Sequence, residues 1–103
     1  SWTEPENDFF LLIDLTLENE GKEDLAVSSI ISFELKDSEG NKGRYAFLLK
    51  SIKSQLDGTV MPGDKLKGQI AFDVLEDNAY SFYFIDSLLD SPIKFEFTSQ
   101  DIN

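Results

Sequence analysis

Short runs in which hydrophobic and polar residues alternate recur along the chain, and turn-forming residues separate them. Side chains of a β-strand point alternately to its two faces, so each run predicts a strand with one buried face. The clearest run follows Pro62 and Gly63 and places Ile70, Phe72 and Val74 on one face. We therefore predict strands at residues 9–17, 28–37, 44–49, 68–75, 80–85 and 93–98.

The segments between these runs are typical of turns and loops. Residues 37–41 predict a hairpin because Gly40 adopts a positive φ without steric cost. Residues 50–60 have no regular period and predict an irregular segment, and a loop is favoured over one helical turn at residues 87–89. The absence of a convincing amphipathic helix favours an all-β fold, an antiparallel two-sheet sandwich of about six to eight strands.

Length and composition favour one globular domain over residues 1–103. A chain of 103 residues buries roughly 60 to 65% of its unfolded surface, which is enough to fold without disulfides or metal. Hydrophobic residues make up 41% of the chain and include nine Phe, which favours a packed core over disorder.

The net charge narrows the range of partners. Twenty Asp and Glu against nine Lys and Arg give a charge of −11, which repels phosphate backbones and anionic membrane surfaces. We therefore expect no nucleic acid partner, and we interpret the acidity as a source of solubility.

The absence of Cys and His excludes much catalytic chemistry. Disulfides, thiolate catalysis, Cys- or His-ligated zinc and a Ser-His-Asp triad all need residues that the chain lacks. Paired carboxylates are available for glycoside hydrolysis, but a small filled sandwich has little room for the deep cleft that such enzymes need. We expect no enzymatic activity and no cofactor.

One turn places oxygen-bearing side chains at alternate positions, as the start of a calcium loop does. Asp37, Glu39 and Asn41 are the candidate ligands, and an acidic group at residues 73–78 is a weaker candidate. The turn lacks the distal glutamate of a complete site, and a hairpin uses the same residue types. A domain that responds weakly to calcium is therefore the alternative to the function proposed at the end of this subsection.

Apolar residues at outward-facing positions suggest a surface for a protein partner. Phe10 and Leu12 in the first strand and Tyr83 and Ile85 in the fifth form one exposed patch if both strands belong to the same sheet. The competing interpretation is that residues 50–60 or the segment around Trp2 cover them.

Four segments together resemble a known bacterial family. They are the strand that runs into Asn19 and Gly21, residues 33–40, Leu56 with the turn at 61–64, and residues 68–74. In this order they resemble bacterial lipoprotein and secreted domains of unknown function, labelled telomeric-repeat-binding-factor-like and related to small secreted immunoglobulin-like antigens. The resemblance implies an immunoglobulin-like fold outside the cytoplasm, commonly lipid-anchored, without catalytic residues.

The N-terminus departs from that family's pattern. Members usually have a lipobox cysteine, a flexible linker and an additional first strand, whereas only residues 1–8 precede the first predicted strand here. We expect that edge strand to be reduced to a few residues around Trp2. Residues 1–8 lack the pattern of a signal peptide, so we expect any targeting segment and lipid anchor upstream of residue 1.

These observations lead to one functional expectation. We expect a non-catalytic binding or structural module of a bacterial lipoprotein or secreted protein, located in the cell envelope, with an unidentified protein partner. Contact with the membrane is expected only through an upstream lipid anchor, and an acidic cytoplasmic β-domain is a further possibility.

Overall fold

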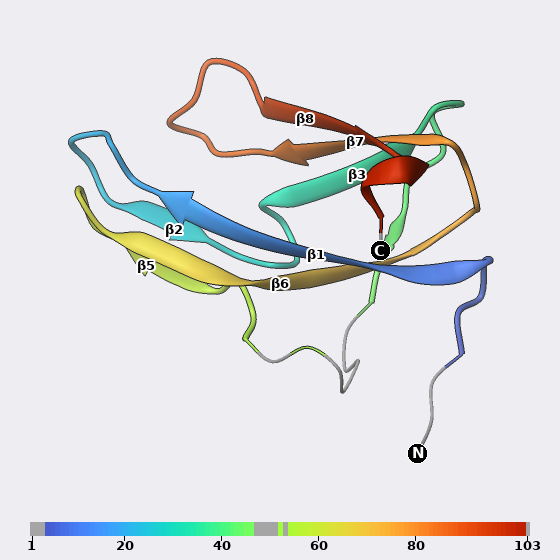
Figure 1. Cartoon of the computed structure of the whole chain (residues 1–103). Helices are drawn as coiled ribbons and strands as arrows, with labels where there is room; N and C mark the ends of the chain where they lie inside the picture. Colours follow the sequence, from blue (N-terminus) through green and yellow to red (C-terminus); the bar gives the residue numbers. More distant parts are fainter. Residues whose placement is uncertain (1–3, 47–51, 53, 103) are drawn as a thin grey trace.

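The computed structural model describes residues 4–46, 52 and 54–102, whose strands form two facing layers (Figure 1). The elements in chain order are β1 (Phe9–Glu18), β2 (Leu25–Val27), β3 (Phe33–Asp37), β4 (Arg44–Tyr45), β5 (Gly58–Val60), β6 (Lys65–Val74), β7 (Ala79–Phe84), β8 (Ile93–Thr98) and the 3₁₀-helix η1 (Ser99–Asp101).

All strand pairs are antiparallel. One layer has the order β1-β6-β4, the other has the order β3-β7-β8, and β2 and β5 form a short ribbon. The longest ladder joins β1 to β6, from Phe9 opposite Val74 to Glu18 opposite Lys65. This arrangement confirms the predicted antiparallel β-sandwich.

The core lies between the two layers and is rich in aromatic side chains. The ring of Phe82 on β7 stacks on Phe33 of β3, with ring centroids 5.5 Å apart. It also meets the edge of Phe72 on β6, in the other layer, at 6.2 Å. Stacked and edge-to-face pairs are the arrangements that aromatic rings prefer, so these contacts favour one packing of the layers.

Tyr80 fixes the corner at which the chain passes from one layer to the other. Its side chain is buried, its hydroxyl donates to the Leu75 carbonyl oxygen at 2.7 Å, and it accepts a hydrogen bond from the Asp77 N–H at 3.0 Å. The ring stacks on Phe97 of β8. A buried tyrosine that bonds back to the preceding corner is a known feature of immunoglobulin-like sandwiches.

The segment from Ser28 to Ser32 differs from the prediction. It was predicted as the first half of a strand with Ile31 inward, but the strand begins at Phe33 and Ile31 is 76% exposed. The Ser32 N–H donates to the Ser28 carbonyl oxygen, and the Ser32 hydroxyl accepts from the Ser28 N–H, each at 2.9 Å. These local bonds close a turn and replace the ladder bonds of a strand.

Two short strands were also missed, and one predicted strand is shorter. β2 and β5 have three residues each, and β5 falls in the segment predicted to be irregular. The strand predicted at residues 44–49 is observed as β4, Arg44–Tyr45, and residues 47–49 lie outside the described part of the chain. The edge strand predicted around Trp2 also lies outside it.

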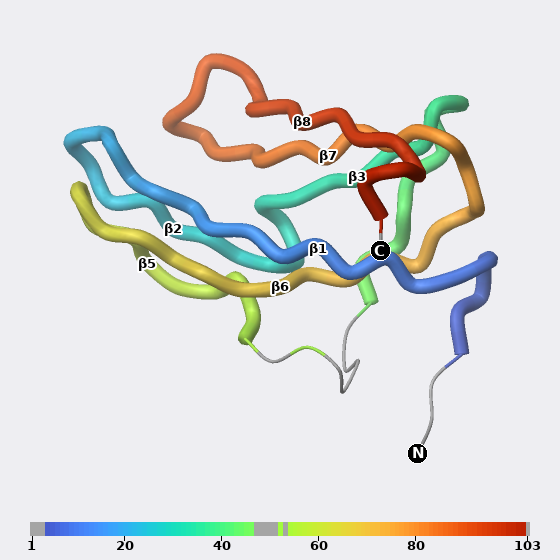
Figure 2. The backbone as a smooth tube through the Cα atoms, viewed as in Figure 1, coloured from blue at the N-terminus to red at the C-terminus, as the bar shows by residue number. Residues whose placement is uncertain are grey.

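The two ends of the sandwich carry different connections (Figure 2). The β1–β2 loop, the β5–β6 turn and the β7–β8 loop lie at one end, whereas the β3–β4 turn and the β6–β7 corner lie at the other. In the β5–β6 turn the Asp64 N–H bonds to the Met61 carbonyl oxygen and Gly63 has φ +86°, as predicted for a Pro-Gly turn.

We predict that Tyr80→Phe lowers the free energy of unfolding by about 1 to 2 kcal/mol, because both hydrogen bonds at the corner lose their partner. Urea unfolding of the two proteins measures the difference. Tyr83→Phe, on the outward face of the same strand, is the matched control. An equal loss in both variants would contradict the role of the corner.

The pH dependence of this difference provides a second check. Burial raises the pKa of Tyr80 above its ordinary value of 10.0. The Tyr80 hydroxyl therefore ionises at a lower pH in the unfolded chain than in the folded protein. Its contribution to the free energy of unfolding is fully present below pH 10.0 and is lost as the pH rises through the raised pKa of the folded protein. The difference in the free energy of unfolding between the wild type and Tyr80→Phe should therefore be constant below pH 10.0 and decrease between pH 10.0 and the raised pKa.

Candidate ligand-binding groove

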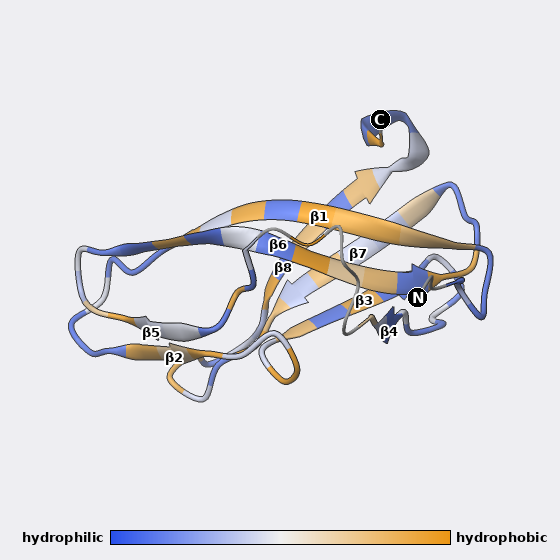
Figure 3. Ribbon diagram, turned by 90° about the horizontal axis from the view of Figure 1, so that it is seen from below, coloured by the Kyte–Doolittle hydropathy of each residue, from blue (hydrophilic) through white to orange (hydrophobic). Residues whose placement is uncertain are grey.

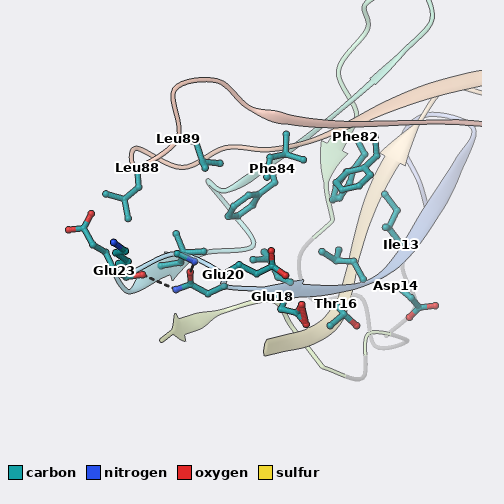
Figure 4. Close-up of a pocket in the computed structure, with 18 of the residues that line it drawn as sticks. Ile13, Asp14, Thr16, Glu18, Glu20, Glu23, Phe82, Phe84, Leu88 and Leu89 are labelled. Atoms are coloured by element: carbon teal, nitrogen blue, oxygen red, sulfur yellow. Dashed lines mark hydrogen bonds between the residues drawn. The ribbon is translucent and has the colours of Figure 1, made fainter. Parts of the chain in front are cut away.

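A groove of about 760 Å³ opens between the two layers at the end that carries the β1–β2 and β7–β8 loops. In Figure 4, Phe82, Phe84, Leu88 and Leu89 project into it from one layer and Ile13 projects from the other. We call it the interlayer groove.

The β1 side of the groove is formed by the inward face of that strand. Ile13, Leu15 and Leu17 line the groove, whereas the residues between them are exposed on the outer face. After a continuous hydrophobic run at the start of β1, hydrophobic and polar residues alternate from Ile13 to Glu18, and Figure 3 shows both parts by hydropathy. The strand alternation therefore directs a continuous apolar stripe into the groove.

The β8 side is more exposed than strand alternation predicts. Phe95 lies opposite Phe82 and Ile93 opposite Phe84 in the β7–β8 ladder, so both share the inward face of that layer. Nevertheless Phe95 is 57% exposed and Ile93 is 45% exposed, because no described residue of the opposite layer covers them. Adjacent inward-facing aromatic and aliphatic side chains that remain in contact with solvent are typical of a binding surface.

Asn19 holds the loop at the mouth of the groove. This residue directly follows β1 and is buried, and its side-chain amide donates to the carbonyl oxygens of Glu23 and Val60, both at 2.8 Å. Its side-chain oxygen accepts from the Gly21 N–H at 2.9 Å. The loop is therefore tied to itself and to β5, so the mouth is a defined surface.

The rim of the groove is acidic. Asp14, Glu18, Glu20 and Glu23 belong to its lining, and Lys22 is its one basic lining residue among the described part of the chain. Figure 4 shows Asp14 and Glu18 directed away from the apolar interior. The groove thus combines an apolar floor with a negatively charged border.

The predicted calcium ligands are engaged in the turn itself. One oxygen of Asp37 accepts hydrogen bonds from the N–H groups of Glu39 and Asn41, and the other accepts from the Asn41 side chain at 3.0 Å. Within the described ranges, no group of three or more Asp and Glu side chains is close enough to hold a metal ion. The calcium alternative stays a prediction of the sequence.

A second acidic residue near this turn has a structural partner. Asp77 accepts hydrogen bonds from the N–H and hydroxyl of Ser38 at 2.8 and 2.7 Å. Both hydrogen bonds from Ser38 lower the pKa of Asp77 below its ordinary value, and the bond from the side chain has the larger effect. Asp77 therefore joins the β3–β4 turn to the β6–β7 corner.

The single apolar patch predicted for a partner is not formed, because its premise was wrong. Phe10 and Leu12 lie on β1, whereas Tyr83 lies on β7 and Ile85 follows that strand, and the two strands belong to different layers. Whether any of the four contacts a partner stays a prediction.

Tyr83 and Ile85 have different surroundings. Lys36 and Lys94 lie over the ring of Tyr83. Ile85 lines a shallow hollow together with Ile31 and Leu88. The side-chain amines over Tyr83 form cation–π contacts that stabilise an ordinary outer sheet face.

The outer face of β6 is covered by a segment that the sequence did not single out. Asp73 is buried there, and its carboxylate accepts hydrogen bonds from the N–H groups of Glu6 and Asn7 at 2.6 and 2.8 Å. Glu6 also pairs with Arg44 of β4. Of the predicted covers, Trp2 and residues 50, 51 and 53 lie outside the described residues.

No helix in the described part of the chain is long and apolar enough to cross a membrane.

We predict that Asn19→Ala lowers the free energy of unfolding by about 2 kcal/mol, since it removes three hydrogen bonds at a buried position. Chemical denaturation measures the change. Asn41→Ala, an exposed amide in the β3–β4 turn, is the control and should lose less than about 0.5 kcal/mol. Similar losses for both would show that Asn19 does not organise the mouth of the groove.

Comparison with known proteins identifies the fold and the family of the chain. The chain is similar to the yjhA protein from Bacillus subtilis, whose crystal structure matches with a TM-score of 0.66 and 20% sequence identity over 95% of this chain and 84% of that one. At this identity the likeness shows the fold alone. Among curated proteins, none matches the chain.

The family match covers most of the sequence. Residues 1–93 match the family described as Domain of unknown function (DUF4352). The coarser part of the predicted resemblance, a β-sandwich domain of unknown function, is thereby confirmed, whereas the comparisons give no support for the telomeric-repeat-binding-factor-like label or for a lipoprotein. The chain belongs to the DUF4352 family, a family of domains of unknown function.

Proposed function

We propose that this domain is a non-catalytic binding module and that the interlayer groove is its binding surface. The observation that supports the proposal is the exposure of inward-facing apolar side chains, above all Phe95 and Ile93. Burying a phenylalanine that is exposed in the free protein contributes about 1.5 to 3 kcal/mol, so covering this face favours complex formation.

The chemistry of the groove supports binding rather than catalysis. Its lining residues supply apolar contact and carboxylates at the rim, and the chain has no His or Cys to act as a general base or a thiolate nucleophile. The ligand is held by contact with the two layers, without a chemical step.

We test the binding surface with a neutral solvatochromic dye whose fluorescence rises in apolar surroundings. The wild type should bind it, and Phe95→Glu should bind it about tenfold more weakly, because a charge is placed at the groove entrance. Leu75→Glu is the matched control, since Leu75 is also exposed and apolar but lies at the β6–β7 corner, at the opposite end of the sandwich.

Equal dye binding by all three proteins would contradict the groove as the binding surface. Urea unfolding of each variant ensures that a loss of binding reflects the groove and not a loss of the fold. Phe95 is exposed, so Phe95→Glu should unfold within about 0.5 kcal/mol of the wild type.

The second part of the proposal concerns location. The domain acts outside the cytoplasm of a bacterium, in a secreted protein or on a lipid anchor upstream of residue 1. The resemblance to secreted and lipid-anchored domains supports this location. Expression of the tagged full-length gene product in its bacterial source, followed by external protease treatment of cells without an outer membrane or of spheroplasts, should remove the tag. A tag protected until the cells are lysed would contradict it.

A further inference from the structure

The interlayer groove lies beside a position at which the described residues supply no edge strand. In an immunoglobulin-like sandwich one layer runs A-B-E-D and the other C-F-G. The layer β1-β6-β4 matches B-E-D and the layer β3-β7-β8 matches C-F-G, in the same chain order. Strand A has no counterpart among the described residues, and its place is the free edge of β1.

Both strands that border the groove have a free edge in the described structure. β1 pairs with β6 alone, and β8 pairs with β7 alone. A free edge presents unpaired N–H and carbonyl groups, to which an extended peptide can add as a further strand. The stripe of Ile13, Leu15 and Leu17 lies directly beside the free edge of β1.

The described N-terminal residues do not fill this place. Glu6 and Asn7 donate their N–H groups to Asp73 of β6, and Glu6 pairs with Arg44 of β4. The chain before β1 therefore runs toward the β6 and β4 side of the layer, away from the free edge. We therefore consider a segment of another molecule as the strand that occupies the position beside the free edge of β1.

The charges along β1 determine which segment fits. Its outer face carries Asp14, Thr16 and Glu18, all exposed. Across the ladder with β6, Asp14 accepts a hydrogen bond from the Gln69 side chain at 2.6 Å and Glu18 pairs with Lys65 at 3.4 Å, so a basic strand at the free edge would share these carboxylates with β6. Opposite charges on neighbouring strands stabilise a pair and like charges destabilise it, so a strand with Lys or Arg on its outer face is favoured. The same rule disfavours β1 of a second copy, which would place carboxylates against carboxylates.

The charges on β8 make that strand a weaker choice. Its outer face carries Lys94 and Glu96, which pair with each other at 3.8 Å. A strand added there would meet both signs of charge. Of the two edges, the edge of β1 is therefore the one whose charges favour a basic strand over an acidic one.

We propose that the domain binds an extended segment of a partner protein, with apolar and basic residues in alternation, as an added strand on the free edge of β1. The inward apolar side chains of this segment cover Leu15, Leu17 and Phe95. Its basic side chains lie beside Asp14 and Glu18 on the outer face. The proposal rests on the function proposed above, since both use the interlayer groove.

The test uses the full chain and a short fluorescent peptide in which lysine alternates with valine, with binding followed by fluorescence anisotropy. The wild type and Leu75→Glu should bind equally. Phe95→Glu should bind at least about tenfold more weakly. Affinity should fall as salt is added, because screening weakens charge attraction at an exposed edge.

Two controls separate strand addition and charge selection from simple apolar contact. The same peptide with N-methylated backbone groups on its pairing edge retains its side chains and charge but cannot donate to β1, and it should not bind. A variant with both Asp14→Lys and Glu18→Lys should lose the lysine peptide and bind a peptide in which glutamate alternates with valine.

The outcomes distinguish this inference from the proposed function. Dye binding that depends on Phe95, together with absent or N-methyl-tolerant peptide binding, would overturn strand addition and leave the groove as a site for another apolar ligand. Peptide binding that ignores Asp14→Lys and Glu18→Lys would overturn charge selection. If neither dye nor peptide depends on Phe95, both proposals fail.

Discussion

The structure depends on the corner at which the chain passes from β6 in one layer to β7 in the other. Tyr80 fills this corner with a buried ring, and its hydroxyl satisfies the Leu75 carbonyl oxygen and the Asp77 N–H. Because β6 and β7 are the central strands of their layers, the corner sets the position of one layer on the other. The contact between Phe72 and Phe82 extends this alignment across the core. A change that removes the Tyr80 side chain or its hydrogen bonds therefore acts on the alignment of the two layers.

The tight corner and the open groove lie at opposite ends of the same sandwich, and this separation has a physical consequence. At the corner, side chains from both layers meet and bury each other, so this part supplies stability. At the groove end, no described residue of the opposite layer covers Phe95 and Ile93, so their exposed apolar surface adds little to folding. That surface is free to contribute to binding. Asn19 anchors the loop at the mouth of the groove through three side-chain hydrogen bonds.

Alternation in the sequence predicted most long strands but could not predict the groove. β1 and β8 were recognised because each has several alternating residues, whereas β2 and β5, with three residues each, are too short to show a period. The alternation of Ile31 and Phe33 with Ser32 predicts an inward Ile31, yet the hydrogen bonds between Ser28 and Ser32 close a turn. Alternation along β8 places Phe95 on the same face as Ile93 and Phe97. Whether the opposite layer covers that face depends on which strands pair, and this is a property of the whole chain.

The acidity of the chain has a more specific meaning once the edges are located. A net charge of −11 suggests solubility when it is considered as a total. On β1, however, Asp14 and Glu18 stand beside a free edge and an apolar stripe, where an uncharged strand would be prone to pair with its own copies. The carboxylates repel such a copy, and they leave the backbone groups available to a strand of opposite charge. In the complex that we propose, the same residues protect the edge from self-association and select the charge of the added strand, so solubility and specificity become two effects of one arrangement of charge.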